Sequence, residues 1–167
     1  MKQKKIFISR NANKALEVLF EISEAVTTTR NLNELYTAIH TSLEKIFNVE
    51  NFYIALHHKE RDSITFPYHV DEKDNNPDEI FNFSETASLT GQVIKARGPL
   101  IFSEQDIIDF AKEQNQKTIG TISKIWIGAP LIIKNEVIGV IAMQSFNSSD
   151  DYKAEDLDLL NTISQHI

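Results

Sequence analysis

Residues 124–146 read KIWIGAPLIIKNEVIGVIAMQSF, which is two apolar runs separated by a short polar break. The runs are Ile125–Ile133 and Val137–Phe146, and the break is the segment 134–136. Both runs are rich in β-branched residues and too short to span a membrane, which predicts the two strands of a β-hairpin. A strand with one face in water alternates apolar and polar side chains, whereas here both parities are apolar. We therefore expect the hairpin in the middle of a sheet that is covered on both faces.

The composition is that of an ordinary globular protein, with 41% hydrophobic and 25% charged residues in a chain of 167. The formal net charge of −7 disfavours binding to nucleic acid or to anionic membranes. The chain contains no cysteine, so disulfides, thiol chemistry and cysteine-ligated metals are excluded. We find no signal peptide and no membrane-spanning run, and the expected compartment is the cytoplasm.

The spacing of apolar residues predicts two helices at the start of the chain. The first covers about residues 13–29 after a tail of residues 1–12, and the second runs from Asn33 to about Phe47. Apolar side chains cover a wider arc of the first helix than packing on one core requires. This arc predicts a second contact, with a partner subunit or an adjoining helix; deeper burial in its own domain is the alternative. Residues 13–167 are expected to form a single domain.

Two antiparallel strands are predicted next, over Phe52–Leu56 and Ile64–Val70. Pro67 cannot donate a hydrogen bond to a neighbouring strand, which predicts a sheet edge or a bulge at that position. The acidic, asparagine-rich segment Asp71–Pro77 that follows predicts a mobile flap.

Three short elements are predicted before the hairpin: a helix over Ser88–Ala96, a strand over Leu100–Phe102 and a helix from Ser103 to about Glu113. Gly98 and Pro99 should end the first of these helices, and Ser103 with Asp106 resembles a capping box that opens the second. A last helix is predicted over about residues 151–167. Its apolar series still runs at the final residue, so we expect a truncated helix and a downstream segment.

Five strings stand in order along the chain: NFYIAL at 51–56, SLTGQVI at 88–94, GAPLII at 128–133, VIGVIA at 137–142 and EDLDLL at 155–160. Their order and spacing resemble the GAF domain family, the small-molecule-sensing modules of signalling proteins. The resemblance covers roughly Leu16–Ile167. Because this family changes its ligand while keeping its hairpin, the resemblance predicts the fold and leaves the ligand and any cofactor unidentified.

The resemblance implies an α+β fold, an α/β sandwich. A central antiparallel β-sheet carries the N- and C-terminal helices on one face, and short helices with the flap, about residues 71–123, cover a pocket on the other. Gly139 in mid-strand indicates a close approach by a covering helix or a ligand. Relatives often have Ser or Thr where Lys153 stands, and Lys cannot cap, so the last helix is expected to start earlier, at Ser149 or Asp150.

Signals of catalysis are lacking. The five glycines stand isolated, so there is no phosphate-binding loop, and neither a Gly-x-Ser-x-Gly elbow nor a His-Glu-x-x-His pattern occurs. In the GAF family, reduction of free methionine sulfoxide and attachment of linear tetrapyrroles use cysteines, which this chain lacks. The Asn-Lys-Phe-type motif of cyclic-nucleotide-binding relatives has no counterpart here. We expect a domain that is not an enzyme.

The three histidines near the first two strands could ligate haem iron or a divalent metal. His57 and His58 are adjacent in the chain and His69 lies near the end of the next strand. Adjacent residues of a strand face opposite ways, so His57 and His58 cannot easily share one ion. Solvated histidines beside a charged turn are the favoured alternative, and no metal is expected.

The candidate ligand pocket combines aromatic and polar residues of the predicted sheet: Phe66, Tyr68, Trp126, Gln144 and Ser145. Trp126, the only tryptophan, could stack on a planar ligand or simply fill the core. Gln144 and Ser145 face opposite sides of their strand, so at most one of them points into a given pocket.

The leading hypothesis is a noncatalytic, small-molecule-sensing regulatory domain of a larger signal-transduction protein, such as a sensor histidine kinase of a two-component system or a diguanylate cyclase. Ligand state would be relayed through the terminal helices to an output domain, and the terminal helices would form a homodimer. No nucleic-acid partner or membrane insertion is expected. The alternative is a ligand-free dimerisation and spacer module whose pocket is collapsed and filled by Phe66, Tyr68 and Trp126.

Overall fold

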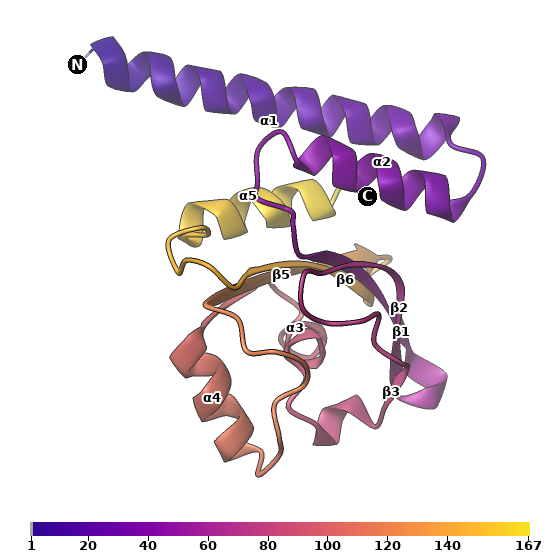
Figure 1. Ribbon diagram of the computed structural model, residues 1–167. Helices are drawn as coiled ribbons and strands as arrows, with labels where there is room; N and C mark the ends of the chain where they lie inside the picture. Colours follow the sequence, from indigo (N-terminus) through magenta and orange to yellow (C-terminus); the bar gives the residue numbers. More distant parts are fainter. Residues whose placement is uncertain (1) are drawn as a thin grey trace. The chain divides into compact units, whose positions relative to one another are not determined.

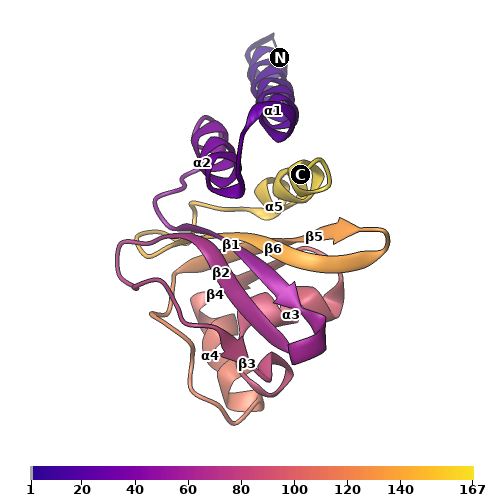
Figure 2. The same cartoon turned by 90° about the vertical axis from the view of Figure 1, so that its right-hand side faces the viewer.

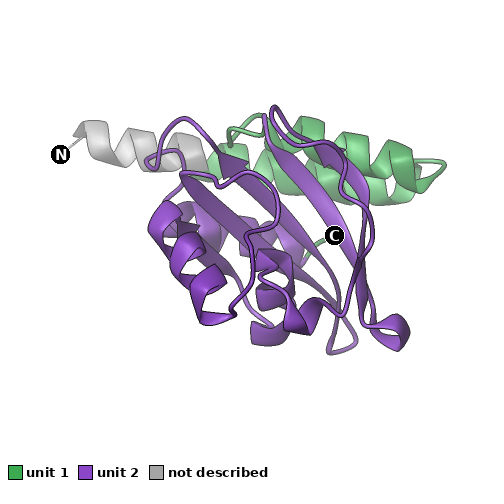
Figure 3. Cartoon of the chain, turned by 60° about the horizontal axis from the view of Figure 1, so that its bottom comes forward, with its two compact units in different colours: residues 1–49, 166–167 green, residues 50–165 purple. Residues whose placement is uncertain are grey.

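The computed structural model describes the backbone of residues 2–167 and the side chains of residues 12–167. The chain divides into two compact units, one of residues 1–49 with 166–167 and one of residues 50–165 (Figure 3). Among the described residues, no helix is both long and apolar enough to cross a lipid bilayer. That residues 13–167 form a single domain stays a prediction.

The first unit is a pair of antiparallel helices, α1 (Lys2–Thr28) and α2 (Leu32–Leu43), which pack against each other (Figure 1). The tail predicted for residues 1–12 is wrong over residues 2–12, because α1 begins at Lys2. This segment contains no Gly or Pro that would break a helix. Helix α2 begins at Leu32 and not at Asn33, and Asn31 caps it: the Asn31 side chain accepts a hydrogen bond from the Glu34 N–H at 3.0 Å.

The second unit is built on a six-stranded antiparallel sheet with the order β3-β2-β1-β6-β5-β4. Its strands are β1 (Phe52–His58), β2 (Ser63–Val70), β3 (Ile80–Phe81), β4 (Leu100–Ser103), β5 (Ile125–Ile133) and β6 (Glu136–Ser145). Its helices are α3 (Leu89–Ala96), α4 (Glu104–Glu113) and α5 (Ala154–Ser164), with short 3-10 turns at Lys59–Arg61 and Phe83–Glu85. The expected α+β fold is confirmed.

The hairpin of β5 and β6 lies inside the sheet, as predicted, and a tight turn joins its strands. Lys134 has a φ of 49° and Asn135 a φ of 69°, the pair of left-handed residues found in type I′ turns. Both faces are buried from Ile125 to Leu131. Ile132 and Ile133 are exposed near the turn, so the prediction of complete coverage is wrong at that end.

The two faces of the sheet are covered by different helices (Figures 1 and 2). On one face α5 packs against β5 and β4 and buries Leu157, Leu160 and Ile163. On the other face α3 packs against β5 and β6, and α4 packs against β4. The hairpin therefore separates a layer made by α5 from a layer made by the two shorter helices.

The helix ends follow local capping chemistry. Ser103 and Asp106 form the predicted capping box at α4, with the Asp106 N–H donating to Ser103 Oγ at 3.1 Å and the Ser103 N–H donating to Asp106 Oδ2 at 2.9 Å. Arg97, not Gly98, takes the left-handed conformation after α3, with a φ of 55°. The prediction that α5 starts at Ser149 or Asp150 is wrong.

Helix α5 begins directly after Lys153, because a carboxylate inside the helix satisfies the backbone at its start. The Lys153 N–H donates to Asp156 Oδ2 at 2.7 Å, while the Lys153 side chain makes no cap hydrogen bond. The helix ends at Ser164, so the prediction that it runs to residue 167 is also wrong.

Two backbone features shape the middle of the sheet. Phe66 and Pro67 lie opposite the single residue Ala55, which confirms the bulge predicted at Pro67. A Cβ on Gly139 would lie 2.3 Å from the Ala55 carbonyl oxygen. The close approach at Gly139 is therefore made by the neighbouring strand β1, and the prediction of a covering helix or a ligand there is wrong.

Candidate functional site

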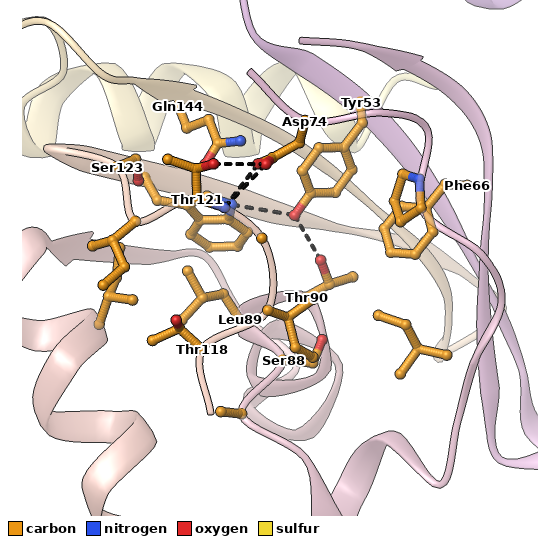
Figure 4. A pocket seen from close by; sticks show the side chains of 18 of the residues that line it. Tyr53, Phe66, Asp74, Ser88, Leu89, Thr90, Thr118, Thr121, Ser123 and Gln144 are labelled. Atoms are coloured by element: carbon orange, nitrogen blue, oxygen red, sulfur yellow. Dashed lines mark hydrogen bonds between the residues drawn. The ribbon is translucent and has the colours of Figure 1, made fainter. Parts of the chain in front are cut away.

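A cavity of about 260 Å³ lies in the second unit, on the sheet face that carries α3 and α4 (Figure 4). Side chains of β1, β2, β5 and β6 form its floor: Tyr53, Phe66, His69, Trp126 and Gln144. The N-terminal end of α3 and Ile107 of α4 form its wall. Its remaining border is made by Asp74, Asn75 and Pro77 of the flap, by Ile80 of β3 and by the segment Thr118–Ser123.

Three of the five candidate residues line this cavity and two do not. Phe66, Trp126 and Gln144 line it. Ser145 lies on the other side of β6, where its hydroxyl donates to Asp151 Oδ2. Tyr68 lies away from the cavity, with its ring centroid 5.9 Å from that of Phe52. The placement of Tyr68 and Ser145 in the pocket was therefore wrong.

The position of the Trp126 indole depends on the glycine two residues further along β5. A Cβ on Gly128 would lie 2.3 Å from Trp126 Cη2, so only glycine leaves room for the indole to lie along the strand. Trp126 is 2% exposed and packs edge to face with Phe102, with ring centroids 5.8 Å apart. It thus belongs to the core and lines the cavity at the same time.

A buried chain of hydrogen bonds joins the floor to the α3 wall. The Trp126 Nε1–H donates to Tyr53 Oη at 3.2 Å, and Tyr53 Oη lies 2.7 Å from Thr90 Oγ1 (Figure 4). Burial raises the pKa of Tyr53 from its ordinary value of 10.0 to about 12, although both hydrogen bonds act in the opposite direction. Tyr53 is therefore a neutral phenol at physiological pH.

His69 stacks on Tyr53, with ring centroids 5.9 Å apart and an interplanar angle of 25°. Burial lowers the pKa of His69, although the negative charges of Asp71 and Asp74 partly offset this effect. The imidazole in the cavity is thus held in its neutral form at neutral pH.

The other two histidines lie outside the cavity and have partners elsewhere. His57 Nδ1 lies 3.2 Å from the Val137 carbonyl oxygen, and His58 Nε2 lies 2.7 Å from Thr65 Oγ1. No cluster of three or more His, Asp or Glu side chains among the described residues is arranged to hold a metal ion. The three histidines are therefore not brought together.

Two aspartates of the flap connect it to the rest of the site. Asp74 accepts hydrogen bonds from the Thr121 N–H, at 3.0 Å to Oδ2, and from the Thr121 hydroxyl, at 2.7 Å to Oδ1. Asp71 Oδ2 accepts a hydrogen bond from Gln144 Nε2 at 2.8 Å, and Asp71 Oδ1 accepts the N–H groups of Lys73 and Asp74. The flap is thus held both to the opposite loop and to the floor.

Ser123 is the one buried side chain of the described residues whose polar atom has no hydrogen-bond partner. It is 1% exposed and lines the cavity. Buried hydroxyls are hydrogen-bonded in the great majority of proteins, so an unpaired one beside a cavity needs an explanation.

Sequence reasoning missed Tyr53, His69 and Ser123 as lining residues. Tyr53 follows Phe52 in the strand, so the two side chains point to opposite faces of the sheet, which the sequence could have shown. The pairing of β1 with β2 then places His69 opposite Tyr53. Nothing in the polar segment around Ser123 indicated that its hydroxyl would be buried.

The sequence model described as GAF domain matches residues 29–167. No curated protein matches the sequence at a significant level.

Solved structures share the fold at low sequence identity. The GAF domain of A. aeolicus nlh2 in an inactive state has a TM-score of 0.69 and 19% identity, covering 93% of this chain and 94% of that chain. The GAF domain of a two-component sensor histidine kinase from Bacillus halodurans has a TM-score of 0.63 and 17% identity, with coverages of 83% and 92%. Free methionine-R-sulfoxide reductase from Neisseria meningitidis, in complex with its substrate, has a TM-score of 0.70 and 16% identity, with coverages of 91% and 84%.

Proposed function

Since the chain belongs to the GAF domain family, whose members in signalling proteins are regulatory modules, we propose that it is a noncatalytic domain that senses a small molecule. Its ligand binds in the cavity between the sheet and the α3–α4 layer. The domain works within a larger signal-transduction protein, such as a sensor kinase or a cyclic-dinucleotide enzyme, and reports the state of the cavity to an output domain.

The observation that carries this proposal is the cavity itself. Its volume of about 260 Å³ is close to the lower end of small-molecule sites, and its lining mixes aromatic side chains with a few polar groups, as such sites do. A ligand-free spacer requires a collapsed pocket filled by aromatic rings. Here Phe66 and Trp126 line the space without filling it, and Tyr68 lies elsewhere. The geometry favours the sensing role over the spacer.

A catalytic role has less support, although the methionine sulfoxide reductase from N. meningitidis shares the fold. The chain contains no cysteine to serve as a redox group. The buried hydroxyl of Ser123 lines the cavity, but it has no hydrogen-bond partner and therefore no base to activate it as a nucleophile.

The proposed relay crosses the sheet. A ligand contacts the cavity face of β5 and β6, while α5 packs on the opposite face of β5. A ligand shifts the position of α5 only if it binds one arrangement of sheet and helix more tightly than the other. The hydrogen bond from Gln144 to Asp71 links the ligand to this equilibrium, because it joins the flap over the cavity to β6.

We further propose a homodimer through α1, with α5 contributing to the contact. Leu16 and Phe20 lie one helical turn apart and are 64% and 71% exposed, which is unusual for large apolar side chains. Sedimentation at high protein concentration tests this proposal. A dimer that becomes a monomer in the double variant L16E/F20E supports it, and a wild-type protein that remains a monomer contradicts it.

Trp126 provides a direct test of ligand binding. It is the only tryptophan in the chain and lines the cavity, so its emission reports on occupancy. We propose to screen nucleotides, haem, amino acids and aromatic acids for compounds that raise the melting temperature and also change this emission. Failure of every compound in both measurements contradicts the sensing role and supports the spacer.

A matched pair of variants then locates the site. Phe66 and Tyr68 are aromatic, partly buried and only two positions apart on β2, but only Phe66 lines the cavity. The substitution Phe66→Ala should weaken binding of any compound found in the screen, whereas Tyr68→Ala should leave its affinity unchanged. Equal losses in both variants contradict binding in this cavity.

A further inference from the structure

The charges around the cavity have one sign. Asp74 is the only charged residue that lines it, and no Lys or Arg is found among its described lining residues. Asp71 adds a second carboxylate close behind Gln144. A ligand with negative charge would be repelled by these carboxylates and would lose part of its hydration on entering the cavity.

Two basic side chains next to the bordering segments are engaged outside the cavity. The Lys73 ammonium lies over the Phe146 ring, 4.9 Å from its centroid. The Lys124 ammonium pairs with Glu104 at 3.0 Å. Neither is in place to neutralise an anion in the cavity, and His69 is held in its neutral form by burial.

The floor of the cavity consists mainly of side chains with aromatic rings. Tyr53 and Phe66 pack edge to face, with centroids 5.4 Å apart and an interplanar angle of 72°. Trp126 and His69 complete the ring-bearing floor. Such rings pack favourably against another aromatic ring, and their faces also attract cations.

One polar group in this lining is unsatisfied. Ser123 Oγ is buried and unpaired, and it can both donate and accept a hydrogen bond. Three other polar groups of the site already have partners: Tyr53 with Thr90, Asp74 with Thr121, and Gln144 with Asp71. Among the fully buried polar side chains of the cavity, Ser123 is therefore the one left for a ligand.

We infer that the cavity takes a small aromatic compound that is uncharged or carries one positive charge, that it rejects anions, and that Ser123 supplies its specific hydrogen bond. This inference rests on the proposed sensing function and narrows it. It argues against phosphorylated ligands such as nucleotides and against aromatic carboxylates.

Three compounds that share a phenyl ring and carry polar groups of different charge test the inference on the intact chain: benzylamine, benzyl alcohol and benzoate. Their binding is measured by Trp126 emission with excitation at the red edge of the tryptophan band, where a phenyl ring does not absorb, and by calorimetry. We expect benzylamine and benzyl alcohol to bind at least about tenfold more tightly than benzoate, because Asp74 repels the anion. Benzoate binding that equals or exceeds the other two overturns the charge assignment.

The charge is then varied on the protein. The substitution Asp74→Asn keeps an oxygen that can accept the Thr121 hydrogen bonds and removes the negative charge. In this variant the ratio of the benzylamine affinity to the benzoate affinity should be smaller than in the wild type. Asp78→Asn is the matched control, since Asp78 belongs to the same segment but is exposed and does not line the cavity. An unchanged preference in Asp74→Asn contradicts the role of this carboxylate.

A pair of serine variants tests the hydrogen bond. Ser123 and Ser145 are each 1% exposed, but Ser145 is hydrogen-bonded to Asp151 on the other side of β6. The substitution Ser123→Ala should weaken benzyl alcohol binding about three- to tenfold without lowering the melting temperature. Ser145→Ala should lower the melting temperature and leave binding unchanged. Benzyl alcohol affinity that does not change in Ser123→Ala overturns the assignment of Ser123.

The outcomes distinguish a failure of this inference from a failure of the proposed sensing function. If a nucleotide or an aromatic acid from the wider screen binds in the cavity and the benzylamine and benzyl alcohol probes do not, the inference is wrong and the sensing function stands. If neither the probes nor any compound of the screen binds, the sensing function itself is wrong.

Discussion

The carboxylate of Asp74 accepts the hydroxyl of Thr121 at 2.7 Å, and this bond joins two segments that are 47 residues apart in the chain. The same carboxylate accepts the Thr121 N–H, at 3.1 Å to Oδ1 and 3.0 Å to Oδ2. Both segments line the cavity, so these bonds close a polar bridge beside it. Gly120 permits the approach: it has a φ of 72°, and a Cβ there would lie 2.9 Å from Asp74 Oδ2.

Removing this bridge should loosen both segments. In Asp74→Ala we expect faster amide hydrogen exchange in residues 118–123, faster dissociation of any bound ligand, and a loss of about 1 kcal/mol in the free energy of unfolding. Thr121→Val keeps the N–H bond and removes only the hydroxyl bond, so its effects should be smaller. Hydrogen exchange followed by mass spectrometry measures the difference, and unchanged exchange in Asp74→Ala would show that the bridge does not hold the segments.

Three glycine variants should rank by what their new Cβ meets. In Gly139→Ala the Cβ would collide with the backbone of β1, and in Gly128→Ala with the Trp126 indole. We expect losses of about 1–3 kcal/mol in both, with a shift in tryptophan emission in Gly128→Ala. Gly98→Ala is the control, because its Cβ would meet only the Ala96 carbonyl oxygen at 3.8 Å. Urea denaturation measures all three, and equal stabilities would contradict the ranking.

The buried phenol of Tyr53 predicts a loss of stability at alkaline pH. Its pKa is about 12 in the folded protein against an ordinary value of 10.0, so the folded state holds the proton more tightly than the unfolded state. The associated stability, on the order of 2–3 kcal/mol, is fully present below pH 10 and is lost as the pH rises towards 12. In Tyr53→Phe the free energy of unfolding should therefore fall less steeply over this range. Equal slopes in wild type and variant would contradict the assignment.

The N-terminus of α5 could be stabilised by a better capping residue. Lys153 occupies the N-cap position in extended backbone, with φ and ψ of −126° and 173°, and its side chain makes no cap hydrogen bond. Lys153→Ser should complete a capping box with Asp156 and raise the free energy of unfolding by about 0.5–1 kcal/mol. Lys153→Ala removes the same charge without adding a cap, so it should bring no such gain. Thermal denaturation of the two variants side by side measures the contribution of the cap.

Much of the fold could be predicted from the sequence, because it is encoded locally. The β5–β6 hairpin followed from its β-branched runs, the α4 capping box from Ser103 and Asp106, and the bulge from Pro67. The predictions failed where contacts between residues that are distant in the sequence determine the local structure. Position 139 requires glycine because the Ala55 carbonyl oxygen of β1 lies so close to it. The residue pattern of β6 alone does not show which strand lies beside it.

The candidate site was harder to predict than the fold. Strand parity showed that Gln144 and Ser145 face opposite ways but could not say which of them faces the cavity. The bulge at Pro67 changes the alternation along β2, so Phe66 lines the cavity and Tyr68 does not. The hydrogen bonds of Asp74 and the burial of Ser123 depend on loops that are distant in sequence.

Gln144 and Ser145 are consecutive residues, yet they bind partners on the two sides of the sheet. Gln144 donates to Asp71 in the flap, and Ser145 donates to Asp151 in the turn before α5. A single peptide group therefore separates the contact with the flap from the contact with the turn before α5. In the proposed sensing function, a ligand that shifts the flap pulls on Gln144 and, through this peptide group, on Ser145. The proposed signal thus needs only a local torsion of β6, with no rearrangement of the strands around it.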